Sequence, residues 1–374
     1  MKVGVNLLWL VPGQVGGTEE YAVRLLEHVA DVKGVEITVF AGRAALDAHP
    51  FLRSAFRAAE GPVTGGRPGR VVTEATWLAA QSRRRDLDLV HHLGGTTPLV
   101  RGAPAIVTIH DLQPLEHPEA FSAVKRHWLA RMLPHAVRNA RFVVAVSEFT
   151  ARAVQERLGV ARDRIRVVRH GFDPPKDALP PAEIERVRTR YDLGSAWVTY
   201  PAATWRHKNH VTLVRAFAPI AADDPDVTLV LTGGAAEAED DVRREINRLR
   251  LDGRIRRTGR VPRADVDALI AGARAVAVPS TFEGFGAPVA EAFALGAPVV
   301  ASACTALPEV AGDAALLLDP LDVDAWTKAL HRLLTEPGLR AELVEAGRRR
   351  ATELTWDQPV EALVTTWRDA LGRA

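Results

Sequence analysis

The sequence holds almost no cysteine, little lysine and little net charge. Its single cysteine, Cys304, excludes a disulfide framework and a zinc site built from several thiolates. Lys and Arg together number 48 against 46 Asp and Glu, so a net charge of +2 gives no reason to expect a nucleic-acid partner. Only 6 of the 48 basic residues are lysines, so a lysine at a motif position is informative.

Long apolar runs are also lacking. No window reaches about 18 uninterrupted apolar residues, the length that a membrane-spanning helix needs. The run Val3–Val11 follows Lys2, but it is too short for a signal peptide and leads into glycines without a small-residue cleavage site. With 47% hydrophobic and 25% charged residues, the sequence predicts a folded, soluble, cytoplasmic protein.

Short apolar runs alternate with longer amphipathic segments along the whole chain. Runs such as Val3–Leu8, Ala105–Ile109 and Ala275–Val278 have the length and composition of buried parallel strands. The segments between them have helical periodicity, and repeated β–α–β units predict doubly wound parallel sheets with helices on both faces. The predicted fold class is therefore α/β, with Rossmann-like sheets.

The alternation restarts after a proline-rich segment, Pro174–Pro181. We predict a Rossmann-like N-terminal domain over residues 1–172, a second Rossmann-like domain over 173–354, and a helix over 355–374 that packs back toward the first domain. Two such domains are expected to face each other across a cleft. Open α/β sheets bind ligands beyond the carboxyl ends of their strands, so residues that follow strands are the site candidates.

Two candidate pairs follow strands of the first domain. Gly16 and Gly17 open a helix, where backbone N–H groups can approach an anion; a flexible turn before a helix has the same pattern. The dinucleotide fingerprint G-x-G-x-x-G is absent. His110 and Asp111 end a central strand and could bond sugar hydroxyls or transfer a proton, although a structural pair looks the same.

The most specific pattern lies in the second domain. Glu283, Gly284, Phe285 and Gly286 follow a strand and open a helix, where N–H groups and the helix dipole suit a phosphate. Glu291, inside that helix, is placed to accept hydrogen bonds from a diol such as ribose. Two carboxylates around a phosphate cradle suit a sugar, a diphosphate and a nucleoside laid along one loop.

A diphosphate also needs fixed positive charge. Arg206 and Lys208 follow the first strand of the second domain and open a helix, so they can supply it. Solvated cations at a helix start would look the same. In a partly desolvated site each contact would contribute about 1.5–3 kcal/mol as a charge-assisted hydrogen bond.

The stretch Pro279–Ser302, PSTFEGFGAPVAEAFALGAPVVAS, resembles the signature of the retaining GT-B glycosyltransferases of glycosyltransferase family 4. Glu283 and Glu291 match the family's E-x7-E motif. Leu307–Ala315 and Arg169–Asp173 continue the likeness, as do Val146-Ser147 and the first-domain pairs. The resemblance implies a GT-B fold and transfer of a sugar from a nucleotide donor, with retention at the anomeric carbon and without a metal.

Carried over by position, the resemblance assigns roles to the second-domain loops. Glu283 would bind donor sugar hydroxyls and Glu291 the ribose, while the backbone of Gly284, Phe285 and Gly286 would face the sugar and the diphosphate. Arg206 and Lys208 would neutralise the departing diphosphate.

In the first domain, His110 would contact the sugar at the reaction centre, and Gly16 and Gly17 would leave room for the diphosphate and the acceptor. One departure stands out: many family members have an arginine where this chain has Ala202-Ala203, and Arg206 could take over its role.

No enzymic base emerges from the sequence, which fits a front-face mechanism. The leaving phosphate oxygen would accept the acceptor's proton, and the protein would stabilise the departing charge. The histidine pairs His91-His92 and His207/His210 lack a carboxylate or cysteine set at ligand spacing, so no metal and no other cofactor is predicted.

A basic segment over residues 119–141 has no acidic residue after Glu119. Its basic residues are Lys125, Arg126, Arg131, Arg138 and Arg141. Apolar residues recur there at helical spacing, and Pro134 is expected to break or kink the helix. Such a segment fits peripheral contact with the inner, anionic face of a membrane, or a core-packed helix with a solvated basic face; we favour the second.

The function predicted is transfer of a hexose-type sugar to a hydroxyl of a glycan, a glycolipid or a small molecule. A GT-B-like sugar-nucleotide epimerase and a non-catalytic nucleotide-sugar binder are the alternatives. Uridine, guanosine and thymidine diphosphate donors all remain open, and GDP-mannose is favoured by family frequency alone, which makes mannosyl transfer the first candidate.

Overall fold

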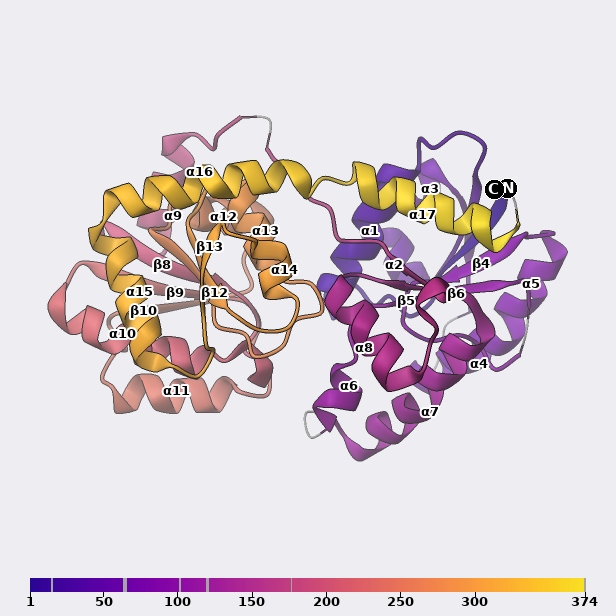
Figure 1. The fold of residues 1–374 in the computed structure, drawn as a ribbon, viewed down its shortest axis with the longest axis horizontal. Coiled ribbons are helices and arrows are strands. Elements are labelled where there is room, and N and C mark those ends of the chain that lie inside the picture. Colours follow the sequence, from indigo (N-terminus) through magenta and orange to yellow (C-terminus); the bar gives the residue numbers. More distant parts are fainter. Residues whose placement is uncertain (15, 63–65, 101, 119–120, 176, 373–374) are drawn as a thin grey trace. The chain divides into compact units, whose positions relative to one another are not determined.

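The chain folds as two compact units, each with its own parallel sheet (Figure 1). The computed structural model describes every residue except 15, 63–65, 101, 119–120, 176 and 373–374. Unit 1 consists of Met1–Gly171 and Trp356–Ala374, and unit 2 of Phe172–Thr355. The domain limits predicted from the sequence, 172/173 and 354/355, each lie one residue from these unit limits.

Unit 1 is built on a seven-stranded sheet in the order β3-β2-β1-β4-β5-β6-β7. All of its printed pairings are parallel, with Val5 opposite Val39 and Asn6 opposite His92. The strands are β1 (Lys2–Leu7), β2 (Glu36–Ala41), β3 (Arg57–Glu60), β4 (Leu89–His92), β5 (Ala105–Ile109), β6 (Ala140–Ala145) and β7 (Ile165–Val167).

Helices cover both faces of this sheet (Figure 1). Ser147 caps α8 by accepting a hydrogen bond from the Thr150 N–H at 3.0 Å, and Gly159 ends that helix with a positive φ of 66°. The helices are α1 (Gly17–Val29), α2 (Arg43–Ala48), α3 (Phe51–Ala55), α4 (Gly66–Thr73), a π-helix (Glu74–Leu78), α5 (Ala79–Arg84), α6 (Gln113–Glu116), α7 (Ala123–Asn139), α8 (Glu148–Leu158), a 3₁₀ turn (Arg162–Arg164) and α17 (Asp357–Ala370).

Unit 2 is built on a six-stranded parallel sheet in the order β10-β9-β8-β11-β12-β13. The strands are β8 (Ala196–Pro201), β9 (Val227–Thr232), β10 (Ile255–Gly259), β11 (Ala275–Val278), β12 (Val299–Ser302) and β13 (Ala315–Leu318). The helices are α9 (Pro181–Arg190), a 3₁₀ turn (Arg206–Lys208), α10 (His210–Asp223), α11 (Glu239–Arg248), α12 (Arg263–Ala271), α13 (Ala287–Ala294), α14 (Leu307–Ala311), α15 (Val323–Thr335) and α16 (Pro337–Glu353).

The strands are apolar because helices bury them from both sides. All residues of β9, β11 and β12 are buried, as are five of the six residues of β1. This explains the continuous apolar runs in the sequence and confirms the predicted fold class, two parallel-sheet α/β domains. In the part of the chain that the structure describes, no helix is long and apolar enough to cross a membrane.

The last helix, α17, packs with the first unit rather than with the second. α17 lies in unit 1, and its Trp367 is buried, with the indole N–H donating to His91 Nδ1 at 3.2 Å. His91 Nε2 in turn contacts the Thr108 hydroxyl at 2.8 Å, so the imidazole bonds at both nitrogens. His91, one of the histidines considered for a metal, therefore holds α17 to β4 and β5.

Candidate active site

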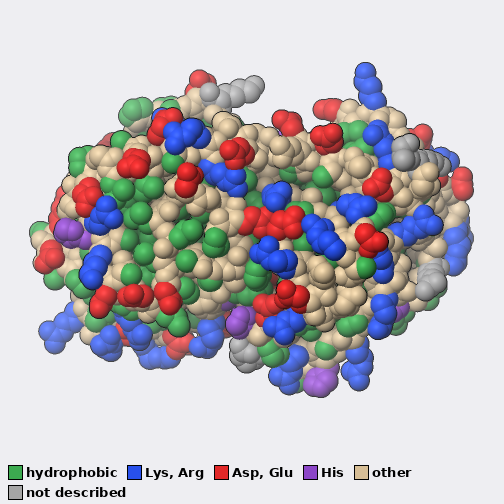
Figure 2. Space-filling model, in the orientation of Figure 1, with side chains coloured by type: hydrophobic (Ala, Val, Ile, Leu, Met, Phe, Trp, Pro, Cys, Tyr) green, Lys and Arg blue, Asp and Glu red, His purple; other side chains and the backbone are tan. Residues whose placement is uncertain are grey.

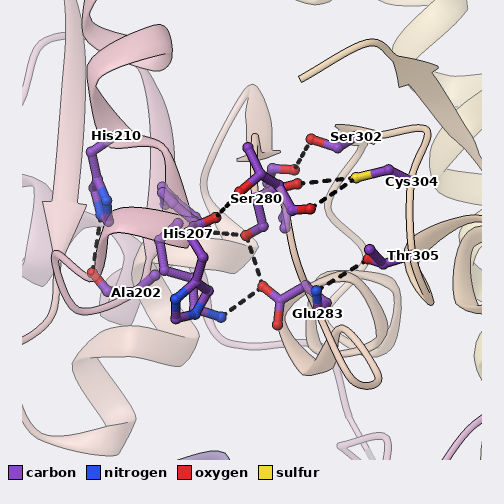
Figure 3. Close-up of polar contacts among 12 residues, drawn as sticks. Ala202, His207, His210, Ser280, Glu283, Ser302, Cys304 and Thr305 are labelled. Atoms are coloured by element: carbon purple, nitrogen blue, oxygen red, sulfur yellow. Dashed lines mark hydrogen bonds and ion pairs between the residues drawn. The ribbon is translucent and has the colours of Figure 1, made fainter. Parts of the chain in front are cut away.

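Two loops meet at the carboxyl edge of the unit 2 sheet, because their strands β8 and β11 are neighbours. The His207 carbonyl accepts hydrogen bonds from the Thr281 N–H at 2.8 Å and from the Thr281 hydroxyl at 3.2 Å (Figure 3). The Asn209 amide donates to Pro279 O at 3.0 Å and to Pro320 O at 2.8 Å. The His207 and Pro279 carbonyls thus tie the two loops together, and the Pro320 carbonyl joins the segment after β13 to them.

The best-placed pair of predicted residues is Lys208 and Glu283. Lys208 Nζ lies 2.6 Å from Glu283 Oε1, and the side chains are only 17% and 11% exposed. A charge-assisted bond of this length in a partly desolvated setting is among the stronger polar contacts in a protein. The structure therefore brings the candidate phosphate-neutralising cation and the candidate sugar-binding carboxylate into direct contact.

Further hydrogen bonds fix Glu283. Its Oε1 also accepts from the Ser280 hydroxyl at 2.7 Å, and Ser280 Oγ lies 2.7 Å from the Tyr200 hydroxyl (Figure 3). The Glu283 N–H donates to the Thr305 hydroxyl at 3.1 Å. Thr305 has a φ of +56°, which is uncommon for a β-branched residue, and such backbone strain clusters at functional sites.

Gly286 immediately precedes α13 and has a conformation that favours glycine. Its φ is 106°, and a Cβ there would lie 2.7 Å from Leu307 Cδ2. Phe285 is buried, and its ring stacks on Phe172 with centroids 6.3 Å apart. The Gly284–Gly286 backbone therefore leads into a helix N-terminus of the kind that binds anions, as the sequence predicts.

Glu291 has a partner that the sequence did not reveal. Arg263 of α12 lies 2.9 Å from Glu291 Oε1 through Nη1 and 2.8 Å from Asp267 through Nε. Glu291 is 13% exposed. A ribose diol bound here would share the carboxylate with a guanidinium.

Arg206 lies apart from this pair. Its side chain is 67% exposed, and its Nη1 is 3.5 Å from Asp241 of α11. Its backbone N–H donates to Glu237. The described contacts do not bring Arg206 to Glu283, so of the two predicted cations Lys208 alone contacts that carboxylate.

In unit 1, His110 follows β5 as predicted. Its Nε2 donates to Leu93 O at 2.8 Å, and the Tyr21 ring meets its edge at a centroid distance of 5.2 Å. Burial lowers the pKa of His110 to about 4, although the bond to Leu93 opposes the shift. The imidazole is therefore neutral near pH 7. Asp111 Oδ1 accepts from the Gln113 N–H.

Gly16 and Gly17 stand at the start of α1. Gly16 precedes the helix with a φ of 56°, which favours glycine, and a Cβ at either position would meet no atom within 4 Å. Space around both residues is thus open, as a ligand-contacting loop requires. Val15, which precedes the pair, lies outside the described residues.

A cavity of about 320 Å³ with a mixed polar and apolar lining opens beside the Lys208 loop, at the carboxyl ends of β8, β9 and β10. Its polar lining includes Thr204, Glu239 and Arg257. Thr204 donates to Glu239 at 3.0 Å, and Arg257 pairs with the same carboxylate. Burial lowers the pKa of Arg257.

Sequence reasoning missed Tyr200, Asn209 and Thr305. Asn209 has a φ of 54° immediately before α10, and asparagine is one of the few residues that tolerate this conformation, so its place before a helix was a usable signal. The other two gave no local signal, because their roles arise from neighbouring strands. In the described ranges, no group of three or more His, Cys, Asp or Glu side chains could hold a metal ion.

Both halves of the chain match family models. Residues 183–350 match the model described as "Glycosyl transferases group 1", and residues 15–176 match "Glycosyltransferase Family 4". O-antigen chain mannosyltransferase B of Escherichia coli is 30% identical over 255 residues, which cover 68% of this chain and 67% of that protein. The MMP alpha-(1->4)-mannosyltransferase of Mycolicibacterium hassiacum is 29% identical over 310 residues, 78% of this chain and 72% of the relative.

Solved structures share the fold. The crystal structure of Anabaena Alr3699/HepE in complex with UDP and glucose superposes with a TM-score of 0.79 at 21% identity, over 99% of this chain and 100% of that one. Sucrose-phosphate synthase from Thermosynechococcus elongatus gives 0.80 at 21% identity, over 100% of both chains.

Proposed function

The chain belongs to the family 4 glycosyltransferases, and from this premise we propose the reaction that it catalyses. The resemblance identified from the residues around Glu283 and Glu291 is thereby confirmed, and the protein is a glycosyltransferase. We propose that it moves a hexose-type sugar from a nucleoside-diphosphate donor to a hydroxyl of a glycan, glycolipid or small-molecule acceptor, with retention at the anomeric carbon.

The observation that carries this proposal is the Lys208–Glu283 contact beside the N-terminus of α13. A carboxylate binds sugar hydroxyls as a hydrogen-bond acceptor, and an ammonium offers its remaining protons to a phosphate. The backbone before α13 adds N–H donors. Donor sugar, diphosphate charge and ribose would thus meet Glu283, Lys208 and Glu291 in order along one edge of the sheet.

The proposed chemistry needs no enzymic base. As the bond to the diphosphate breaks, negative charge grows on its leaving oxygen, and Lys208 and the α13 backbone stabilise that charge. The leaving oxygen accepts the proton of the acceptor hydroxyl on the same face of the sugar. His110, neutral near pH 7, would contact the sugar as a hydrogen-bonding group rather than as a cation.

We propose that the reaction is independent of a divalent metal, since Lys208 supplies positive charge where a metal would otherwise act. Turnover measured in excess EDTA and in added Mg²⁺ or Mn²⁺ should be equal within about twofold. Loss of turnover in EDTA, restored by a metal, would overturn this part of the proposal.

For the donor we propose GDP-mannose first, because two of the similar proteins are named mannosyltransferases. UDP-glucose follows, because the HepE structure is a complex with UDP and glucose. The cavity lined by Thr204 and Glu239 lies next to the Lys208 loop and offers room for the nucleoside. A dTDP-sugar completes the set to be tested.

The direct test is a turnover assay with GDP-mannose, UDP-glucose and dTDP-glucose against a mixed panel of glycan, lipid-linked and small-molecule acceptors. We expect one donor to release its diphosphate in an acceptor-dependent manner, with the donor's anomeric configuration in the product by NMR. Inverted product would refute the retaining mechanism. Isomerised free sugar nucleotide would favour the epimerase alternative, and binding without turnover would favour the non-catalytic binder.

Peripheral membrane contact through residues 119–141 is a separate proposal; residues 119 and 120 lie outside the described part. α7 continues through Pro134 and exposes Val124, Arg126 and Arg131. Exposed basic and apolar groups on one helix suit an anionic lipid surface. Co-sedimentation with phosphatidylglycerol vesicles at low salt should fall severalfold in R126S/R131S. An equal fall in R188S/R349S, which alters exposed arginines of unit 2, would count against α7.

A further inference from the structure

The two carboxylate oxygens of Glu283 have different surroundings. Oε1 accepts hydrogen bonds from Lys208 Nζ at 2.6 Å and from Ser280 Oγ at 2.7 Å. Oε2 makes no hydrogen bond to any residue that the structure describes, and Figure 3 shows it turned away from Ser280. One oxygen is therefore held by the protein, and the other is presented for a further contact.

The hydroxyl chain behind Oε1 has a single direction. A carboxylate only accepts, so Ser280 donates its one proton to Glu283. The Ser280 oxygen must then accept from the Tyr200 hydroxyl, which lies 2.7 Å away. Burial, helped by the nearby charge of Glu283, raises the pKa of Tyr200, so the phenol keeps its proton across the working pH range.

The far end of this chain is anchored in the core of the sheet. Tyr200 and Ser280 are both fully buried. Tyr200 lies on β8, and Ser280 lies two residues after the end of the neighbouring strand β11. The Tyr200 ring packs against His210, with centroids 4.8 Å apart. His210 is itself held through a contact of 3.2 Å between Nε2 and Ala202 O (Figure 3).

We propose that Ser280 and Tyr200 are positioning residues, whose hydroxyl chain holds Oε1 of Glu283 so that Oε2 faces the donor sugar. The proposal rests on the proposed function, which places the sugar at Glu283. Without the Ser280 hydroxyl, the carboxylate is free to rotate and to bind Lys208 through both oxygens. The sugar hydroxyl would then lose an oriented acceptor, while the diphosphate would keep its cation.

The test compares two ligands in each variant by calorimetry: the nucleoside diphosphate and its sugar nucleotide, as GDP and GDP-mannose or as UDP and UDP-glucose, whichever pair wild type binds. Ser280→Ala should weaken binding of the sugar nucleotide about tenfold, the value of a hydrogen bond to a charged group, and change that of the diphosphate less than twofold. Tyr200→Phe removes a hydrogen bond to Ser280 rather than to Glu283 itself. It should weaken binding of the sugar nucleotide, relative to the diphosphate, by about threefold.

Ser302→Ala is the matched control. It removes another fully buried serine hydroxyl from the same sheet, but Ser302 donates to Val278 O at 3.4 Å and not to Glu283. Its ligand affinities should match wild type. A double-mutant cycle adds the decisive measurement: in a Glu283→Gln background, Ser280→Ala should change the ratio of the two affinities less than twofold.

Equal weakening of both ligands by Ser280→Ala, or an undiminished effect in Glu283→Gln, would show a merely structural role and overturn the proposal. So would unchanged affinity for both ligands. A wild-type protein that binds neither ligand would instead overturn the proposed function itself, and this inference with it. Ligand binding by the wild-type protein therefore distinguishes failure of this inference from failure of the proposed function.

Discussion

The two units differ in the kind of ionisable side chain that they take out of water. Unit 1 holds four neutral histidines, of which His91, His92 and His170 are buried and His110 is half-buried, and desolvation lowers the pKa of each to between about 3 and 4. Unit 2 relies on carboxylates surrounded by arginines. Asp265 lies within 3.2 Å of Arg186 and Arg190, and Glu245 within 2.7 Å of Arg215 and Arg248.

The neutral histidines of unit 1 and the arginine-bound carboxylates of unit 2 lose their stabilising effect at different pH values. Below about pH 6.5 these histidines take up protons in the unfolded chain but stay neutral in the folded protein until about pH 3–4, so acid favours unfolding. The arginine contacts lower the pKa of Glu245 to about 2, and a hydrogen bond from Tyr191, together with the arginines, lowers the pKa of Asp265, so their stabilisation persists until much lower pH. Unit 2 has one comparable histidine among the described residues, His210, with its pKa lowered to about 4.

The largest expected effect is therefore selective acid unfolding of unit 1. At pH 5.5 each of these histidines lowers the free energy of unfolding by about 1.4 kcal/mol, so the four of unit 1 cost about 5–6 kcal/mol and His210 of unit 2 about 1.4 kcal/mol. Hydrogen exchange followed by mass spectrometry should show β1, β4 and β5 opening before β8, β9 and β11 between pH 6.5 and 5. Simultaneous opening of both sheets would contradict the predicted difference in acid stability between the units.

His91→Gln sharpens the same measurement. Glutamine does not titrate and can both accept from Trp367 and donate to Thr108, as His91 does. The acid loss of unit 1 should shrink by about a quarter, or about 1.4 kcal/mol at pH 5.5. If the pH dependence of unit 1 stability were unchanged in this variant, His91 would not contribute to its acid unfolding.

Next in size is the loss of the charged pair in the candidate site. Lys208→Ala removes the cation beside Glu283 and should lower kcat/KM by about 10²–10³, the usual scale for losing one electrostatic contact to the leaving group. Arg215→Ala, which breaks the Glu245 pair of the same unit, should leave kcat/KM within about twofold. Similar activity in both variants would remove Lys208 from the chemistry.

A smaller effect comes from one buried indole in each unit. Trp367→Phe removes the donor to a histidine nitrogen in unit 1, and Trp326→Phe removes the donor to the Asp319 carbonyl in unit 2. Each should cost about 1–3 kcal/mol in urea unfolding. Only the unit 1 variant should change its pH dependence, and it should become slightly less acid-sensitive, because loss of a bond to the neutral ring raises the pKa of His91 in the folded protein toward its unfolded value.

The smallest expected effect is that of Arg206→Ala. Arg206 is mostly exposed and lies 3.5 Å from Asp241, so stability should change by less than about 0.5 kcal/mol. We expect kcat/KM to fall less than tenfold, far less than for Lys208→Ala. A fall as large as that of Lys208→Ala would show that Arg206 replaces the arginine that this chain lacks at Ala202-Ala203.

Periodicity predicted both sheets, and the rule that ligands gather at strand ends predicted the loops of Lys208 and Glu283. The contact between those two residues depends on β8 and β11 being neighbours in space, although 75 positions separate the residues in sequence. No local pattern encodes that order. For the same reason the Arg263–Glu291 pair and the Tyr200–Ser280 chain emerged only from the structure.

The return of α17 to the first sheet makes unit 1 discontinuous in sequence, with all of Phe172–Thr355 inserted within it. During synthesis most of unit 1 is made first, but its last segment, Trp356–Ala374, is made after all of unit 2. Trp367 is therefore missing while β4 and β5 already carry His91 and Thr108. Unit 1 is the first unit to be started in translation and the last to be completed.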